Sequence, residues 1–267
     1  MRFHRITNQE RHLYQPGIVA IEKTATYPLG DDFFQIDHGS DYFAFFDRLG
    51  KVNYYAMCDN ENIAAVGAGV LRQIPYQQGS FPKEAWYLCD LKVHPNYQKR
   101  HLSLRILSQA IYDGIRECAS GYLISMNPGD GSTNRLVQIL ERYSLVKFTA
   151  SSQLGIYSLD ATTMNSIAPL IKEYQGDISY LSLQGIKDLR LLSTNNILPL
   201  AHVQWAANAH KGMSEVIPGY THMFCIPSSD EFTRILAQKA IFPNATASIV
   251  SHGMDNSDWR FILTSDI

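Results

Sequence analysis

The chain has 267 residues, of which 45% are hydrophobic and 11% aromatic, and its 23 basic residues nearly balance its 25 acidic ones. A chain of this length and hydrophobicity buries one large core or two smaller ones, which excludes a disordered or fibrous protein. No Lys/Arg cluster is larger than Lys99-Arg100, so the electrostatic footprint of a nucleic-acid-binding protein is missing. We therefore expect no nucleic-acid partner.

The cysteines and the first residues of the chain bear on its compartment. Cys58, Cys89, Cys118 and Cys225 are widely scattered, without a C-x-x-C pair, as is typical of free thiols in a reducing environment. The start of the chain lacks the apolar core of a signal peptide, and no run of about 18 apolar residues could span a bilayer. We expect a cytoplasmic protein with no membrane partner.

The first half of the chain is predicted to form a sheet flanked by helices. Residues 1–50 are long enough for one strand and two helices, and their aromatic cluster at 33–46 fits either helix packing or a substrate-facing surface. From residue 53 the pattern predicts strand, strand, strand, helix, strand, helix, strand, strand. The predicted strands are 53–58, 63–71, 86–93, 121–127, 147–150 and 154–159, and the predicted helices are 104–118 and 133–143.

The rest of the chain is too long for a tail. Apolar runs predict strands at 198–205, 221–226, 247–250 and 259–263, and the capping-box residues 228–231 predict a helix after 221–226. The order strand, helix, strand, strand in this region is similar to that of half of the preceding region. We therefore predict two domains, 1–160 and 161–267, the second being a C-terminal lobe that resembles a degenerate half of the first.

Residues 86–107 form the most informative segment. An apolar strand ends at Val93, the basic turn 94–101 follows, and a helix begins near Leu102. The start of a helix presents unpaired backbone N–H groups and the positive end of the helix dipole, and added basic side chains favour a phosphate there. The segment therefore predicts a site for a phosphate-bearing ligand.

This segment resembles the acyl-CoA-binding motif of the GCN5-related N-acetyltransferases (GNAT), a strand ending in Val-x-Pro followed by Gln/Arg-x-x-Gly-x-Gly/Ala at a helix start. Val93, Pro95 and Gln98 match, whereas His101 and Ser103 stand where the family has small residues. The resemblance implies a mixed α/β fold of the GNAT type in residues 1–160. It also implies acetyl-CoA as the acyl-donor cosubstrate.

The same resemblance implies which residues hold the cofactor. They lie on the strand, on the turn and helix start, and around the later helix. They are Leu91, Lys92, Val93, Gln98, Lys99, Arg100, His101, Leu102, Ser103, Asn127 and Asn134.

Two residues are predicted to be catalytic. In the family the base that neutralises the amine is often a carboxylate on the cofactor strand, and Asp90 is the one acid of residues 86–93. The alternative is that Asp90 bonds backbone N–H groups at a strand distortion. A tyrosine that protonates the leaving thiolate is expected seven residues after Asn134, where Glu141 stands; Tyr143 is the nearest tyrosine.

These features predict an N-acetyltransferase in which an amine attacks the thioester directly. The acceptor is a small-molecule or peptide amine, and a homodimer is left open. Zinc-protease, nucleophile-elbow, Walker A and dinucleotide motifs are absent from the sequence, and the histidine spacing indicates no metal site. The alternative is an inactive module of the same fold that binds CoA or a protein partner.

Overall fold

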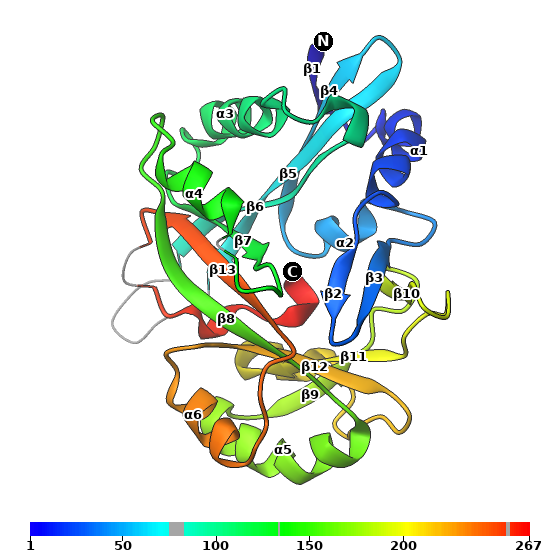
Figure 1. The fold of residues 1–267 in the computed structure, drawn as a ribbon. Helices are drawn as coiled ribbons and strands as arrows, with labels where there is room; N and C mark the ends of the chain where they lie inside the picture. The colour runs from blue at the N-terminus through cyan, green and yellow to red at the C-terminus, as the bar shows by residue number, and fades with distance from the viewer. Residues whose placement is uncertain (75–82, 133, 255–256) are drawn as a thin grey trace.

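The computed structural model describes residues 1–74, 83–132, 134–254 and 257–267. These residues form one ten-stranded sheet and a separate three-stranded sheet, with helices packed against the large sheet (Figure 1). Thr133, with which the second predicted helix begins, lies outside the described residues.

The strands of the large sheet come from both halves of the chain. In sheet order they are β1 (Arg2–Ile6), β4 (Lys51–Asp59), β5 (Asn62–Ile74), β6 (Lys83–Val93), β7 (Gly121–Met126), β13 (Ala245–His252), β8 (Thr149–Leu159), β12 (Thr221–Pro227), β11 (Leu200–Trp205) and β9 (Ile178–Leu181). The small sheet has the order β10 (Asp188–Leu191), β3 (Asp32–Asp37) and β2 (Tyr27–Leu29).

The described helices flank these strands. They are α1 (Arg11–Glu22), α2 (Ala44–Asp47), α3 (Leu102–Gly114), α4 (Arg135–Glu141), α5 (Ala161–Gln175) and α6 (Glu231–Gln238), with 3-10 turns η1 (Pro95–Tyr97), η2 (Ala206–Lys211), η3 (Trp259–Phe261) and η4 (Thr264–Asp266).

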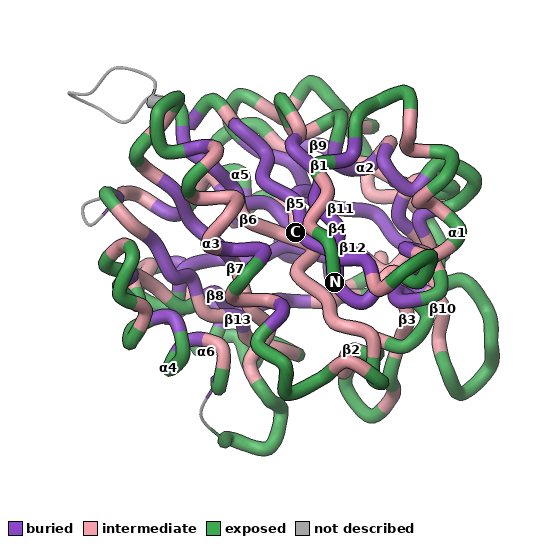
Figure 2. Tube along the Cα trace, turned by 90° about the horizontal axis from the view of Figure 1, so that it is seen from above, coloured by how far each residue is buried: buried purple, intermediate pink, exposed green. Residues whose placement is uncertain are grey.

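Strand β4 shows why the predicted strands read as continuous apolar runs. Because successive side chains of a strand point to opposite faces, Tyr54 and Ala56 pack in the core cluster that includes α1 and α2, whereas Tyr55 and Met57 pack in the cluster that includes α3. The sheet is therefore covered on both faces here. Figure 2 shows the resulting purple, buried strands at the centre of the molecule.

The C-terminal strand β13 lies inside the sheet of the first half. Its antiparallel partners are β7 on one side and β8 on the other, and Figure 1 shows it in orange beside these two green strands. On its other edge, β8 pairs with β12 in antiparallel orientation. The two halves therefore share one continuous sheet.

The two halves also share a feature of their topology. β6 and β7 are parallel and paired over Trp86–Leu88 and Gly121–Leu123, and β11 and β12 are parallel and paired over Leu200–His202 and Thr221–Met223. The connection between β6 and β7 contains helix α3, whereas that between β11 and β12 contains the 3-10 turn η2. The second pair thus repeats the strands without the long helix.

Several predicted elements differ from the structure. The strands expected at 147–150 and 154–159 are the single strand β8, and α3 ends at Gly114 rather than at Cys118. The strand expected at 259–263 is wrong, because η3 occupies its start. Trp259 is buried there by ring contacts with Tyr122, so its apolar character reflects packing without strand pairing.

We expect residues 1–160 expressed alone not to fold to a stable protein. Without β13, the apolar strands β7 and β8 lose their shared neighbour, and buried Ile249 and Val250 leave the core. Circular dichroism and urea unfolding of this fragment should show no cooperative transition, and co-expression with residues 161–267 should restore it. A cooperative transition in the fragment alone would contradict this expectation.

Candidate functional site

The candidate site lies where β6 and β7 diverge. Their parallel pairing is limited to the starts of the strands, and Cys89–Val93 and Ile124–Met126, all of them described, are not paired with each other. β6 keeps its pairing with β5 up to Val93, and β7 keeps its pairing with β13 up to Met126. The inner backbone groups of both strands are therefore available to a ligand lying between them.

A β-bulge in β6 lies beside this divergence. Cys89 is paired with Ala68 and Lys92 with Val66, so that Asp90 and Leu91 face the single residue Gly67. Asp90 has a φ of 55°, a left-handed conformation that Asp tolerates better than most residues. A Cβ on Gly67 would lie 2.9 Å from the Cγ2 atom of Ile106 on α3 and 3.1 Å from Cδ1 of Leu91, so the close packing of α3 here favours glycine. Such bulges bend a strand and redirect side chains next to functional sites.

The redirected Asp90 belongs to a buried ionic cluster, which we define as Glu22, Tyr42, Tyr54, Asp90 and Lys92. The Tyr42 hydroxyl lies 2.9 Å from each Asp90 carboxylate oxygen and 2.8 Å from Oε2 of Glu22. The Tyr54 hydroxyl donates to Asp90, and the Lys92 ammonium bonds both carboxylates. The Lys92 side chain is 14% exposed, and those of Glu22 and Asp90 are 3% and 2% exposed.

The charges of this cluster are mutually dependent. Burial raises the pKa of Glu22, and the attraction of Lys92 opposes that rise. Burial would lower the pKa of Lys92, but Asp90 and Glu22 raise it, so the ammonium stays charged. Burial next to Asp90 also raises the pKa of Tyr42 and of Tyr54 well above the usual tyrosine value. Both phenols are therefore neutral donors.

His38 lies against the cluster but does not share its charge. Its ring is 4.5 Å from that of Tyr42, between centroids, and its Nδ1 lies 3.2 Å from the carbonyl oxygen of Ile186. Burial lowers the pKa of His38 to about 4. The imidazole is therefore neutral at physiological pH.

Glu22 is a candidate residue that the sequence analysis missed. Both Asp90 oxygens accept hydrogen bonds within the cluster, whereas Oε1 of Glu22 is buried without a hydrogen-bond partner among the described residues. A buried carboxylate oxygen without a donor is costly unless a ligand supplies one. The available signal was an acid directly following Ile21 in the buried stripe of α1, which also contains Ile18.

The basic turn has the backbone shape of a glycine-containing turn. Lys99 and His101 have φ values of 63° and 54°, so His101 adopts the conformation for which the family uses glycine, at a cost of about 1 kcal/mol. Gln98, Lys99, Arg100 and His101 are exposed, and the Arg100 guanidinium lies 5.1 Å from the centroid of the Tyr97 ring. The turn therefore keeps its left-handed backbone at His101, and the exposed imidazole projects from the turn.

Helix α3 starts from this turn without a side-chain cap. His101 makes no capping hydrogen bond, and the first helical bond runs from Arg105 N to His101 O. The N–H groups of Leu102, Ser103 and Leu104 therefore remain available. The Leu102 side chain is buried against β4 and β5, so its contribution to a ligand would come from the backbone.

The other predicted cofactor residues on β6 are Leu91, Lys92 and Val93. Leu91 and Val93 are partly buried and pack against the core cluster that contains Leu102 and Ile106. Lys92 belongs to the buried ionic cluster. At this strand the backbone, rather than these side chains, faces the divergence.

Asn127 and Asn134 form a network at the end of β7. Asn134 caps α4, accepting from Leu136 N and Val137 N, and it donates to Asn127 Oδ1 at 3.0 Å. Asn127 donates to Thr246 on β13 at 3.0 Å. The two amides therefore fix α4 to the diverging strand, and their side chains are already engaged by protein groups.

Tyr143 lies in a different cluster from Asp90. Its hydroxyl is 2.5 Å from Oγ of Ser108 on α3, and its ring packs against Phe148. Tyr143 thus adjoins the helix that follows the basic turn, whereas Asp90 bonds Tyr42, which precedes α2, and Tyr54 on β4. The two predicted catalytic residues approach the diverging strands from opposite faces of the sheet.

Two negative findings apply to the described part of the chain. No group of three or more His, Cys, Asp or Glu side chains there is arranged to hold a metal ion. None of its helices is long and apolar enough to cross a membrane.

The chain was compared with family models, with curated proteins and with solved structures. No family model matches the chain. Uncharacterized protein L340 of Acanthamoeba polyphaga mimivirus is 27% identical over 238 residues, which are 85% of this chain and 68% of that protein. A tandem GNAT protein from the clavulanic acid biosynthesis pathway superimposes with a TM-score of 0.55 and 8% identity, covering 96% of this chain and 99% of that one.

A protein of Enterococcus faecalis described as a probable N-acyltransferase is similar with a TM-score of 0.48 and 8% identity, covering 94% of this chain and 72% of that one. The superposition on the tandem protein shows that the chain has the GNAT acyl-CoA N-acyltransferase fold. The mixed α/β fold and the GNAT resemblance expected from residues 86–107 are therefore confirmed.

We expect Lys92→Met to destabilise the protein by about 3–5 kcal/mol, because it leaves two buried carboxylates without their cation. Urea unfolding measures this loss. Lys51→Met is the matched control, because Lys51 forms an exposed pair with Glu117 and should cost about 0–1 kcal/mol. Adding Glu22→Gln and Asp90→Asn to Lys92→Met should recover part of the loss; a cost equal to that of the control would disprove the role of Lys92.

Proposed function

We propose that the protein is an acetyl-CoA-dependent N-acetyltransferase. The observation that carries the proposal is the combination, in a GNAT fold, of diverging parallel strands with an exposed basic turn that opens an uncapped helix. The phosphates of the acyl donor would be held by the N–H groups of Leu102, Ser103 and Leu104. Lys99 and Arg100 would add positive charge.

The thioester would lie between β6 and β7, beside the backbone of Leu91–Val93. An N–H group there would stabilise the negative charge that develops on the carbonyl oxygen. Asn127 and Asn134 would support this position by holding the end of β7. His101 and Ser103 would border the phosphates with side chains.

In the proposed reaction, a neutral amine attacks the thioester carbon, the C–N bond forms, and the C–S bond breaks as the thiolate leaves. The amine loses one proton, for which we propose Asp90 as the base, and the thiolate gains one, for which we propose Tyr143 as the acid. The Tyr42 and Lys92 contacts of Asp90 would hold its carboxylate in place. The acceptor would be a small-molecule or peptide amine.

We also propose that residues 161–267 are a degenerate GNAT-like half. The parallel pair of β11 and β12 repeats that of β6 and β7, and the similarity to a tandem GNAT protein extends over 96% of the chain. In the second pair, η2 connects β11 to β12 in place of an anion-binding turn and long helix. A single acyl-donor site per chain follows from this arrangement.

Titration with acetyl-CoA or CoA should raise the thermal stability of the purified protein saturably. A ligand at 100 times its dissociation constant adds about 2.7 kcal/mol to the free energy of unfolding. Lys99→Ala with Arg100→Ala should weaken binding, whereas Lys172→Ala on α5 should not. No shift at millimolar ligand would contradict the proposal, and binding without turnover on a broad amine panel would favour an inactive CoA-binding module.

Asp90→Asn should lower the alkaline-side rate about tenfold or more if Asp90 accepts the proton. The measurement is kcat/KM against pH with an amine that the panel identifies. Asp177→Asn is the control, because Asp177 lies on the surface, paired with Lys172. An unchanged profile in Asp90→Asn together with a lost alkaline limb in Glu22→Gln would transfer the role of base to Glu22.

A further inference from the structure

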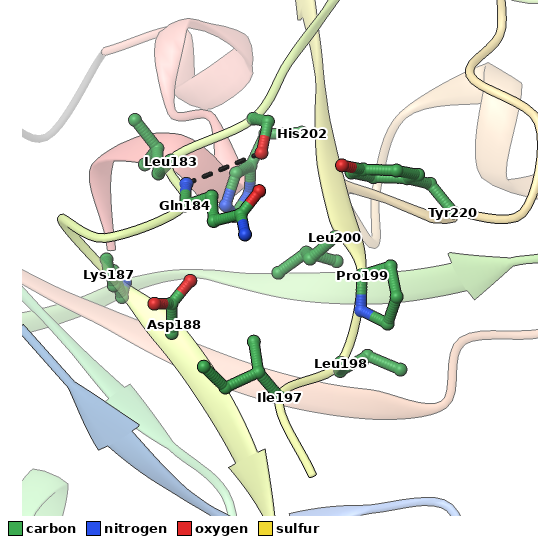
Figure 3. Close-up of a pocket in the computed structure, with 11 residues that line it drawn as sticks. Leu183, Gln184, Lys187, Asp188, Ile197, Leu198, Pro199, Leu200, His202 and Tyr220 are labelled. Atoms are coloured by element: carbon green, nitrogen blue, oxygen red, sulfur yellow. Dashed lines mark hydrogen bonds between the residues drawn. The ribbon is translucent and has the colours of Figure 1, made fainter.

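A cavity of about 190 Å³ lies in the second half of the molecule, away from the basic turn. Its walls come from the segment between β9 and β10, from β11 and the residues before it, and from Tyr220 (Figure 3). The aliphatic part of the lining is Leu183, Ile197, Leu198, Pro199 and Leu200. The volume is smaller than that of typical sites for drug-sized ligands, which indicates a small molecule.

The first unusual group in this lining is Lys187. It is only 7% exposed, and among the described residues its ammonium has no hydrogen-bond or ion-pair partner. Its Nζ lies 4.5 Å from the centroid of the Phe45 ring. A buried cation without an anion is costly, so a ligand with a carboxylate would satisfy it.

The charges around Lys187 favour the same ligand. Burial, followed by repulsion from Arg48 and Lys92, lowers the pKa of Lys187 to about 7, and the carboxylates of Glu22 and Asp266 oppose this only in part. At the Lys187 ammonium, repulsion by Arg48 and Lys92 therefore exceeds the attraction of Glu22 and Asp266. An incoming carboxylate would raise the pKa again and hold the ammonium in its charged form.

The second unusual group is His202, which is 2% exposed and also lines the cavity. Its Nδ1 lies 3.0 Å from Oγ1 of Thr264, and that hydroxyl donates its proton to the carbonyl oxygen of Met223. Thr264 can therefore only accept from Nδ1, so the ring proton is on Nδ1 and Nε2 is an acceptor. Nε2 has no partner among the described residues.

A third polar group faces the same space. Figure 3 shows the Asp188 carboxylate directed toward the middle of the cavity, opposite the aliphatic wall, and its Oδ2 accepts one hydrogen bond from Gly185 N. The lining thus includes the cation of Lys187, the neutral acceptor of His202 and the carboxylate of Asp188, together with the polar side chains of Ser182, Gln184 and Tyr220. A ligand that complements the first three groups carries a carboxylate next to an ammonium group.

We propose that this cavity binds a small aliphatic α-amino acid. Its carboxylate would pair with Lys187, its ammonium group would donate to His202 and Asp188, and its side chain would lie on the wall formed by Ile197 and Leu200. The lining shares no residue with the divergence of β6 and β7, and in this proposal the ligand is bound without being acylated.

Isothermal titration of the full chain with L-leucine, in the absence of any acyl donor, tests the proposal. We expect saturable binding, weaker by about tenfold or more for leucine methyl ester, which lacks the carboxylate, and for 4-methylpentanoate, which lacks the ammonium. No binding of leucine, valine or alanine at millimolar concentration would overturn the proposal. So would equal binding of 4-methylpentanoate, which would indicate a plain carboxylate site.

Lys187→Met should weaken leucine binding by about tenfold or more while raising the melting temperature of the free protein, because it removes a buried, unpaired cation. Lys172→Met, at an exposed lysine, should change neither. Unchanged leucine binding in Lys187→Met would overturn the proposal.

A second measurement does not depend on the folding of a variant. Affinity of the wild-type protein for leucine should fall as pH rises through 7 toward 9, because Lys187 loses its proton while Arg48 and Lys92 stay charged and His202, whose pKa burial lowers, stays neutral. A flat profile over this range would contradict the role of Lys187.

Discussion

The interruption of β6 at Asp90 is the constraint on which the rest of the candidate site depends. The bulge follows directly after the last paired residues of β6 and β7, so the strand bends where the parallel ladder stops. The same bulge brings the Asp90 carboxylate beneath α1 and α2, where Lys92 and the Tyr42 hydroxyl meet it. One local distortion thus opens the sheet and assembles the buried charges beside the opening.

The buried charges of this cluster affect one another and the groups around them. Two buried carboxylates need the ammonium of Lys92, and its positive charge in turn opposes protonation of the nearby Lys187. The two lysines come from different halves of the chain. Buried polar groups without a hydrogen-bond partner among the described residues, here the Lys187 ammonium and Oε1 of Glu22, are characteristic of sites built for a ligand, because a well-packed apolar interior would cost less free energy.

The site could be predicted only in part from sequence. The strand, turn and helix of residues 86–114 follow from local signals, namely apolar runs, Pro95 and basic residues before a helical stripe. Glu22 was missed although it directly follows Ile21 in the buried stripe of α1, because that position alone does not distinguish a buried acid from one at the edge of an amphipathic helix. The strand expected at 259–263 was wrong, because an apolar run records burial but not how the backbone is paired.

By itself the sequence determined the alternation of strands and helices, the phosphate-suited turn and the resemblance that the fold confirms, because these depend on residues close together in the chain. Only the tertiary structure decided that β13 lies between β7 and β8, that Glu22 meets Lys92, and that Thr264 sets the tautomer of His202. Each of these contacts joins distant segments. Hydrophobic periodicity states which face of a strand is buried, but the neighbours of that strand are chosen by closure of the whole sheet.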